Sequence, residues 1–251
     1  MTKALVASSQ LQIVLVEPSH PGNIGAIARA MGNFNSTELA IVRPKCDPLD
    51  PEAQARACHG VEILKSAKIF ESCAEAVARS HFILAATSRE RSFFKQQITP
   101  HDFARIFLPL SGIETFSLLF GNERTGLENE DLALATHIVN IPTNIENPSL
   151  NLSQAALLLL WEFSKLTDQP LESFSNGLEP AIANETEGFK AQLFALLEKV
   201  GFFKSFSQRE SLRLSVSDLI ARARPDVRDI KMLRGIIHRI DLTIKRLKEK
   251  Q

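Results

Sequence analysis

Three separate segments of the sequence bring glycines together with amide, hydroxyl and charged side chains, an arrangement typical of ligand-binding loops. In the first, residues 18–30 read PSHPGNIGAIARA, and Gly22 and Gly25 permit close approach of the backbone to a neighbour. Asn23 can cap the helix that begins here. Arg29 lies beside the apolar stripe of that helix, so its guanidinium can be held near the protein interior. The alternative for Arg29 is an ordinary surface ion pair.

The second and third segments follow predicted strands. Residues 120–131 read FGNERTGLENED, where Gly121 favours ligand contact and Glu123 adds a charge. A tight turn at Gly121, and an N-cap or a solvated role for Glu123, are equally open. Residues 141–163 read IPTNIENPSLNLSQAALLLLWEF, in which Ser149 and Asn151 stand just before an apolar helix. Either side chain can simply cap that helix.

Better-known signatures of nucleotide and metal sites are missing from the sequence. Near the first predicted strand Gly22 and Gly25 lack the GxGxxG spacing, and no GxxxxGK[ST] stretch occurs anywhere. HExxH is also absent, and the six His residues are scattered. A Rossmann or P-loop enzyme is therefore not indicated, and we expect no metal site.

The elements that must position these segments alternate between strand and helix. Short apolar runs predict strands, and apolar residues at helical spacing predict helices between them. Such alternation predicts an α/β domain over residues 1–166, with a parallel sheet whose ligands collect at the carboxyl ends of its strands. The predicted strands are 11–17, 38–43, 81–87, 116–120 and 137–141, and the predicted helices begin at 23 and span 51–58, 73–79 and 151–165.

The C-terminal third has a different composition. Residues 167–188 contain Pro170, Gly177 and Pro180 without periodicity, which predicts a linker. Helical patterning resumes at 189–200, 208–223 and 228–249, so we expect a small helical extension over 189–251. Residues 201–251 carry 13 Lys and Arg against six Asp and Glu, net +7, whereas residues 1–200 carry net −7. A basic extension suits a polyanion, although a solvated helix face would look the same.

Overall composition is that of a globular protein, with 44% apolar and 23% charged residues. The longest apolar run, residues 155–161, is too short to span a membrane, and the N-terminus does not resemble a signal peptide. Cys46, Cys58 and Cys73 are odd in number and lack metal-type spacing. We therefore expect a cytoplasmic protein with free thiols and no membrane partner.

Taken together, NxGAxxRA at 23–30, FGNExxGL at 120–127 and IPxxxxxxSLNLSxA at 141–155 resemble the three motifs of the SPOUT superfamily of RNA 2′-O-methyltransferases. Within it the chain is most similar to the TrmJ group, tRNA methyltransferases that act on the ribose of anticodon-loop nucleotide 32. Residues 222–240, RARPDVRDIKMLRGIIHRI, resemble the helical extension of that group. One departure is ACHGV at 57–61, where relatives often have an AAGA-like stretch, so the role of His59 stays open.

The resemblance implies a C-terminal trefoil knot in the sheet, an obligate homodimer with its active site at the subunit interface, and S-adenosylmethionine as cofactor. It implies tRNA as substrate, and the preference for cytidine or uridine stays open. It assigns Arg29, Asn23, Glu123 and Asn151 to catalysis. Positions matching cofactor-contacting segments are Thr87, Ser88, Arg89, Gly121, Ile141, Ser149, Leu150 and Asn151, and candidate RNA-binding residues are Arg222, Arg224, Arg228, Lys231 and Arg234.

Methyl transfer to a ribose hydroxyl requires that its proton be removed or that the developing alkoxide be stabilised. A guanidinium rarely gives up its proton in proteins, so we interpret Arg29 as an electrostatic group rather than a base. Two alternatives stay open. The chain can be a SPOUT enzyme acting on rRNA or on another tRNA position, or an RNA-binding member without catalysis.

Overall fold

A computed structural model of the chain describes residues 10–88, 96–107, 114–167 and 180–248. The described strands form one seven-stranded sheet in the order β3-β2-β1-β6-β4-β7-β5, and every pairing is parallel. The predicted α/β class with a parallel sheet is confirmed. The strands are β1 (Leu11–Val16), β2 (Glu38–Val42), β3 (Lys68–Phe70), β4 (Phe82–Ala86), β5 (Gln96–Ile98), β6 (Phe116–Phe120) and β7 (His137–Val139).

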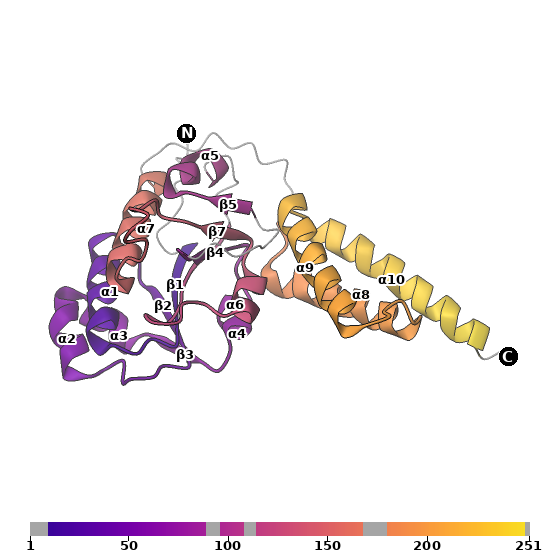
Figure 1. Cartoon of the computed structure of the whole chain (residues 1–251), viewed down its shortest axis with the longest axis horizontal. Coiled ribbons are helices and arrows are strands. Elements are labelled where there is room, and N and C mark those ends of the chain that lie inside the picture. The colour runs from indigo at the N-terminus through magenta and orange to yellow at the C-terminus, as the bar shows by residue number, and fades with distance from the viewer. Residues whose placement is uncertain (1–9, 89–95, 108–113, 168–179, 249–251) are drawn as a thin grey trace.

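Helices cover both faces of this sheet (Figure 1). Apolar side chains of α1 and α7, such as Ile27 and Leu159, pack with Ile13 and Leu118 on one face. Val14 and Leu119 point to the other face, where α4 and α6 cover them. The helices of this body are α1 (Pro21–Asn33), α2 (Pro51–Ala57), α3 (Val61–Lys65), α4 (Cys73–Val77), α5 (Phe103–Phe107), α6 (Asn129–Leu134) and α7 (Leu152–Thr167).

Two glycines set the packing of α1. A Cβ atom on Gly25 would lie 2.1 Å from the carbonyl oxygen of Ala53 in α2, and one on Gly60 would lie 2.4 Å from that of Ala28. Gly25 therefore permits the predicted close backbone approach, and the neighbour is a second helix. In the ACHGV stretch, Gly60 is buried against α1 while His59 is exposed to solvent.

Three further helices, α8 (Ala183–Lys199), α9 (Phe206–Ala223) and α10 (Val227–Lys248), project from the body as an arm (Figure 1). They share a small core around Phe189 and Ile230. The arm joins the body through backbone hydrogen bonds from Ala183 to Ser80 (2.8 Å) and from Asn184 to Ala78 (3.0 Å).

The predicted linker, 167–188, is wrong at its C-terminal end, because α8 begins at Ala183. Residues 168–179 lie outside the described residues. Five short elements were not predicted from the sequence: β3, β5, α3, α5 and α6. Across the part of the chain that the structure describes, each helix is too short or too polar to cross a lipid bilayer.

Candidate functional site

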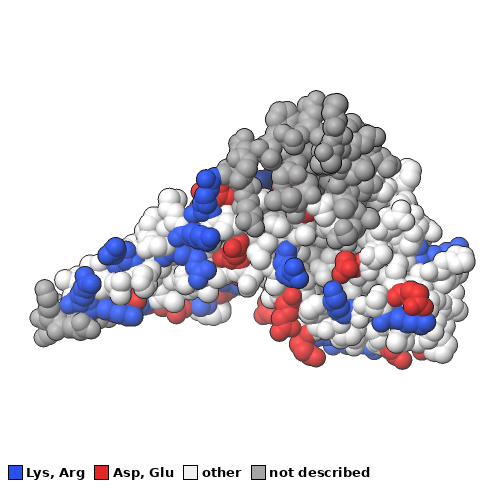
Figure 2. All heavy atoms as spheres, turned by 180° about the vertical axis from the view of Figure 1, so that it is seen from behind, with Lys and Arg blue, Asp and Glu red and all other residues white. Residues whose placement is uncertain are grey.

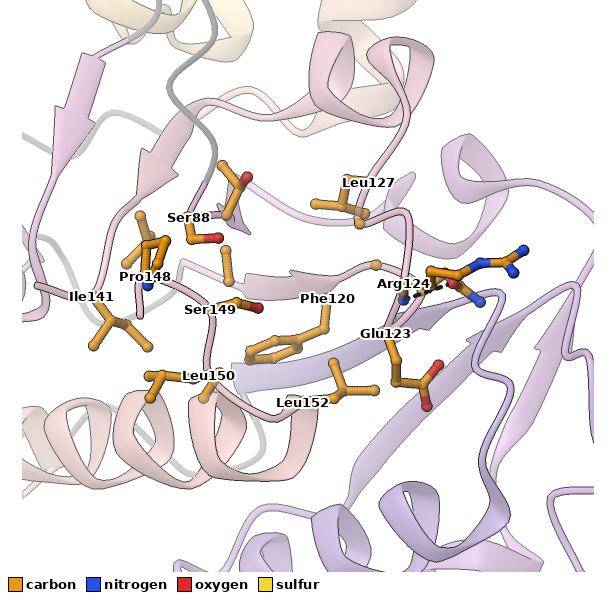
Figure 3. Close-up of a pocket in the computed structure, with 17 residues that line it drawn as sticks. Ser88, Phe120, Glu123, Arg124, Leu127, Ile141, Pro148, Ser149, Leu150 and Leu152 are labelled. Atoms are coloured by element: carbon orange, nitrogen blue, oxygen red, sulfur yellow. Dashed lines mark hydrogen bonds between the residues drawn. The ribbon is translucent and has the colours of Figure 1, made fainter. Parts of the chain in front are cut away.

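A cavity lies at the carboxyl ends of β4, β6 and β7, the edge of a parallel sheet where ligands are expected. Together with the open solvent at its mouth, the space measures about 810 Å³. Figure 3 shows how the loops after the three strands surround it. Apolar side chains form much of the wall, namely Phe120, Leu127, Ile141, Leu150 and Leu152.

Six of the eight positions predicted to contact a cofactor line this cavity: Thr87, Ser88, Gly121, Ile141, Ser149 and Leu150. Asn151 comes next in the chain but is not part of the wall. Arg89 lies outside the described residues. The structure thus brings residues from three separate loops around one space.

Asn122 shapes the loop after β6, although no role for it was predicted from the sequence. Its side-chain oxygen accepts hydrogen bonds from the backbone N–H of Arg124 (3.0 Å; dashed in Figure 3) and of Thr125 (3.2 Å). Its Nδ2 donates to the carbonyl oxygen of Glu17 at 2.8 Å, which ties the loop to the end of β1. Because Asn side chains commonly accept hydrogen bonds from the backbone two residues further on, the Asn in GNERTG indicates this turn from the sequence.

The loop also requires its glycines. A Cβ atom on Gly121 would lie 2.2 Å from the backbone carbon of Gly126, and Gly126 itself has φ +72°. Gly121 therefore makes a tight turn, and it also lines the cavity, so ligand contact by Gly121 stays a prediction.

Glu123 at the mouth of the cavity holds the start of α1. Its carboxylate accepts hydrogen bonds from the backbone N–H of Ser19 (3.0 Å) and His20 (3.2 Å). It also accepts from the hydroxyl of Ser19 (2.7 Å) and from Nδ2 of Asn23 (3.0 Å). Partial burial by itself would raise the pKa of Glu123, but the hydrogen bonds from Asn23 and Ser19 outweigh it and hold the pKa below 4.5.

The prediction that Asn23 caps α1 is wrong. The N-cap is His20 without a side-chain bond, and Pro21 occupies the first turn. The amide of Asn23 is used elsewhere, since its Nδ2 donates to Glu123 and its Oδ1 accepts from Nδ2 of Asn151 at 3.1 Å. The first and third segments are thereby joined directly.

Asn151 has two functions at once. Its Oδ1 accepts from the backbone N–H of Ser153 (2.9 Å) and of Gln154 (3.4 Å), which caps α7. Its Nδ2 reaches Asn23. The capping interpretation is therefore confirmed for Asn151, and it does not exclude a role in the site. Glu123, Asn23 and Asn151 form one hydrogen-bonded chain across all three segments, called here the amide bridge.

Arg29 stands apart from the amide bridge. Its side chain is exposed while its neighbours Ala28 and Ala30 are buried, so the expectation that its guanidinium lies near the interior is wrong. The cause is that the apolar stripe of α1 faces the sheet and leaves Arg29 on the outer side. Arg29 does not line the cavity of its own chain.

The five candidate RNA-binding residues all lie on the arm, in different surroundings. Arg222 pairs with Asp218 (3.0 Å), Arg228 with Asp226 (3.5 Å), and Arg234 donates to Gln192 (3.0 Å). Lys231 is exposed. Arg224 instead lies 5.7 Å above the ring of Phe82 in the body, and burial lowers the pKa of its guanidinium. Figure 2 shows blue residues distributed along the arm.

A metal site is not evident in the described part of the chain, where no group of three or more His, Cys, Asp or Glu residues is placed to hold an ion. The cavity wall offers apolar side chains, hydroxyls and backbone groups, and Glu123 connects it to the amide bridge.

The chain is similar to known proteins over most of its length. Residues 10–161 match the model of the SpoU rRNA Methylase family. The chain is 30% identical to the tRNA (cytidine/uridine-2'-O-)-methyltransferase TrmJ of Photorhabdus laumondii, over 92% of this chain and 96% of that protein. It is 31% identical to an uncharacterized tRNA/rRNA methyltransferase of Haemophilus influenzae, over 93% and 97% of the two chains.

Among solved structures, that of TrmJ from Z. mobilis superposes with a TM-score of 0.80 at 34% identity, covering 92% of this chain and 98% of the other. A match over so much of both chains includes residues of the C-terminal helices as well as the body.

Proposed function

The chain belongs to the SpoU rRNA Methylase family, and from this premise we propose that it methylates the ribose 2′-hydroxyl of nucleotide 32 in the anticodon loop of tRNA. The methyl donor in this proposal is S-adenosylmethionine. The relatives named as tRNA (cytidine/uridine-2'-O-)-methyltransferases, matched over more than nine-tenths of this chain, support tRNA as the substrate.

The observation that carries the proposal is the amide bridge. Asn23 is separated in the sequence by 100 residues from Glu123 and by 128 from Asn151, yet hydrogen bonds join the three side chains, and Glu123 lines the cavity. A ribose placed there meets amide groups held in fixed orientation, and positioning supplies a large part of the rate of a transfer reaction.

The cavity fits the proposed cofactor on three counts. Phe120, Leu127 and Leu150 offer an apolar surface for a base, and Ser88 and Ser149 offer hydroxyls for the polar end. Gly121 brings backbone to the wall without a side chain. When bound, the cofactor supplies a methyl group activated by a sulfonium centre. The residues of the chain then hold the ribose hydroxyl and stabilise the charge that develops on its oxygen as its proton passes to solvent water.

Glu123 acts in this proposal as a positioning group. Its carboxylate already accepts the hydrogen bonds of Ser19, His20 and Asn23, and its lowered pKa keeps it ionised at neutral pH. Proton removal by Glu123 would disrupt these bonds. The charge on the ribose oxygen is better matched by a guanidinium, which is planar and donates in a fixed geometry.

Arg29 is the guanidinium that we assign to this task, acting from a second subunit. It is exposed on α1, away from the cavity of its own chain. A homodimer is supported by the exposed apolar side chains of the adjacent α7, where Leu157, Leu158 and Trp161 are 43%, 41% and 51% exposed. Such a stripe on one helix is typical of a protein interface.

The proposal includes the trefoil knot of the superfamily. It is supported by the strand order, in which β7 inserts between β4 and β5 and the chain then returns through residues 141–151 to α7. It also includes a cytoplasmic location, which the free cysteines Cys46, Cys58 and Cys73 favour.

The test is methyl incorporation from labelled S-adenosylmethionine into unmodified tRNA transcripts, followed by nuclease mapping of the modified ribose. We expect label at nucleotide 32. The family description and the name of the Haemophilus influenzae relative also mention rRNA, so rRNA fragments are tested as a second substrate. Label in rRNA alone, or at another tRNA nucleotide, would replace the proposed substrate. Binding of tRNA without any transfer would indicate a non-catalytic RNA-binding protein.

A further inference from the structure

A second cavity lies at the opposite end of the same strands, between the body and the arm. Its walls come from the amino ends of β4 and β7, from the end of α6, and from α8 and α9. It encloses about 640 Å³, part of it open to solvent. Because β4 is five residues long, roughly 13 to 17 Å of strand separates this junction cavity from the candidate active site.

The walls of the junction cavity are fixed by hydrogen bonds. Backbone N–H groups at the start of α8 donate to Ser80 and Ala78 of the body, and Ala181 donates to the carbonyl oxygen of Pro225 at 3.0 Å. Pro180 and Asp226 form an isolated bridge beside them. A ligand bound here would contact body and arm together.

Two cations converge on the junction cavity. Arg224 ends α9 in a left-handed conformation, with φ 47°, and its guanidinium lies over Phe82. Lys190 of α8 is mostly buried, pairs with Glu187 and donates to the hydroxyl of Ser217 at 3.1 Å. The carboxylate of Glu187 also lines this cavity. Arg224, Lys190 and Glu187 together carry one net positive charge.

Arg224 differs from the other arginines of the arm. Arg222, Arg228 and Arg234 each have an acceptor on a neighbouring side chain. Among the described residues, the Arg224 guanidinium contacts the ring of Phe82, which satisfies none of its N–H donors. A guanidinium with free donors beside a second cation is a site for an anion with several oxygens.

We propose that the junction cavity binds a phosphate group of the RNA backbone, with Arg224 as its main ligand and Lys190 as the second cation. The proposal rests on RNA as the substrate, as inferred above, and adds a contact remote from the reacting ribose. A polymer phosphate is favoured over a free anion because the cavity opens toward solvent at the base of a basic arm. The full-length protein would then hold its substrate at both ends of β4.

The test measures binding of an unmodified tRNA transcript to the full-length protein by fluorescence anisotropy, at a series of salt concentrations. Arg224→Met keeps the apolar stem over Phe82 and removes the donors. We expect binding about tenfold weaker near 0.1 M salt, and a slope of log affinity against log salt that is smaller by about 0.7 to 0.9. Arg224→Lys should restore the slope, since it keeps the charge.

Arg239→Met is the matched control, because Arg239 is an exposed arginine on α10 outside the cavity. It should change the slope much less than Arg224→Met. An equal change would mean that diffuse charge on the arm, not the cavity, binds RNA. An unchanged slope for Arg224→Met would overturn the proposal. So would a loss of binding shared by Arg224→Met and Arg224→Lys together with a lower Tm, which would make Arg224 a docking contact.

Binding of inorganic phosphate and of AMP is measured separately, to distinguish a free phosphate from a phosphate of the RNA backbone. If either stabilises the wild type but not Arg224→Met, while the tRNA slope is unaffected, the cavity takes a free anion and the proposal fails. Methyl transfer is measured in parallel. Transfer by the wild type with an unaffected slope would refute this inference alone, whereas a changed slope without transfer would leave it standing and refute the proposed reaction.

Discussion

Replacement of Glu123 by alanine removes the one carboxylate that connects the loop after β6 to the start of α1. Four hydrogen bonds of 2.7 to 3.2 Å are lost, two of them from backbone N–H groups of Ser19 and His20. Bonds to a charged group contribute about 1.5 to 3 kcal/mol each when buried, but water can reach this partly exposed cluster. We therefore expect a total loss of about 2 to 3 kcal/mol, which lowers Tm by roughly 5 to 10 °C in a chain of this size.

The dependence on pH is a second part of the same prediction. Because the pKa of Glu123 is lowered in the folded protein, its stabilisation is fully present above the ordinary value of 4.5. It is lost as pH falls through the folded-state pKa, when the carboxylate takes up a proton. The difference in Tm between wild type and Glu123→Ala should thus be constant near neutral pH and shrink below about pH 4.5.

The assay is thermal unfolding followed by circular dichroism across that pH range, with methyl transfer measured on the same samples. Glu130→Ala, an exposed carboxylate of α6, is the control and should leave Tm within about 1 °C. A Tm of Glu123→Ala equal to that of the wild type at neutral pH, or a difference that grows on acidification, would refute the role of Glu123 as a clamp.

Three other predictions test the remaining parts of the proposal. Arg29→Lys keeps the charge but loses planar bidentate donation, so kcat should fall about a hundredfold or more with an unchanged Tm, and near-normal turnover would exclude this role. Removal of residues 168–251 should weaken tRNA binding much more than cofactor binding in a calorimetric titration, and equal losses in a folded protein would argue against an RNA-binding arm. Leu158→Glu should yield monomers in sedimentation analysis and abolish methyl transfer, while a dimer that persists would place the interface elsewhere.

Much of the body could be predicted from the sequence because its central strands are apolar on both faces. β1, β4 and β6 are almost wholly buried and read as short apolar runs. β3 and β5 were not predicted because they are edge strands of three residues, and the first two side chains of each are exposed. The early start of α8 was not predicted, because residues 183–188 are mostly polar and include Gly188. Apolar residues at helical spacing are therefore missing from its first turns.

The site was predictable in its residue types but not in its hydrogen bonds. Pro21 is a known signal for the first helical turn, and it places Asn23 inside the helix rather than at its cap. Ser19 was missed because a lone serine before a helix carries no sign of a partner about a hundred residues away. Arg29 is exposed because the sheet and α2 pack on other sides of α1. This packing is known only from the assembled fold, so the exposure of Arg29 could not be predicted from the sequence.

The side-chain amide of Asn151 makes two different contacts: its oxygen caps α7, and its nitrogen donates to Asn23. An aspartate at this position would keep the oxygen that starts the helix, but it would lose the donor to Asn23 and add a negative charge. The difference is a single atom, an oxygen in place of a nitrogen. The start of α7 and the contact between the first and third segments can therefore be separated by a substitution at this one position.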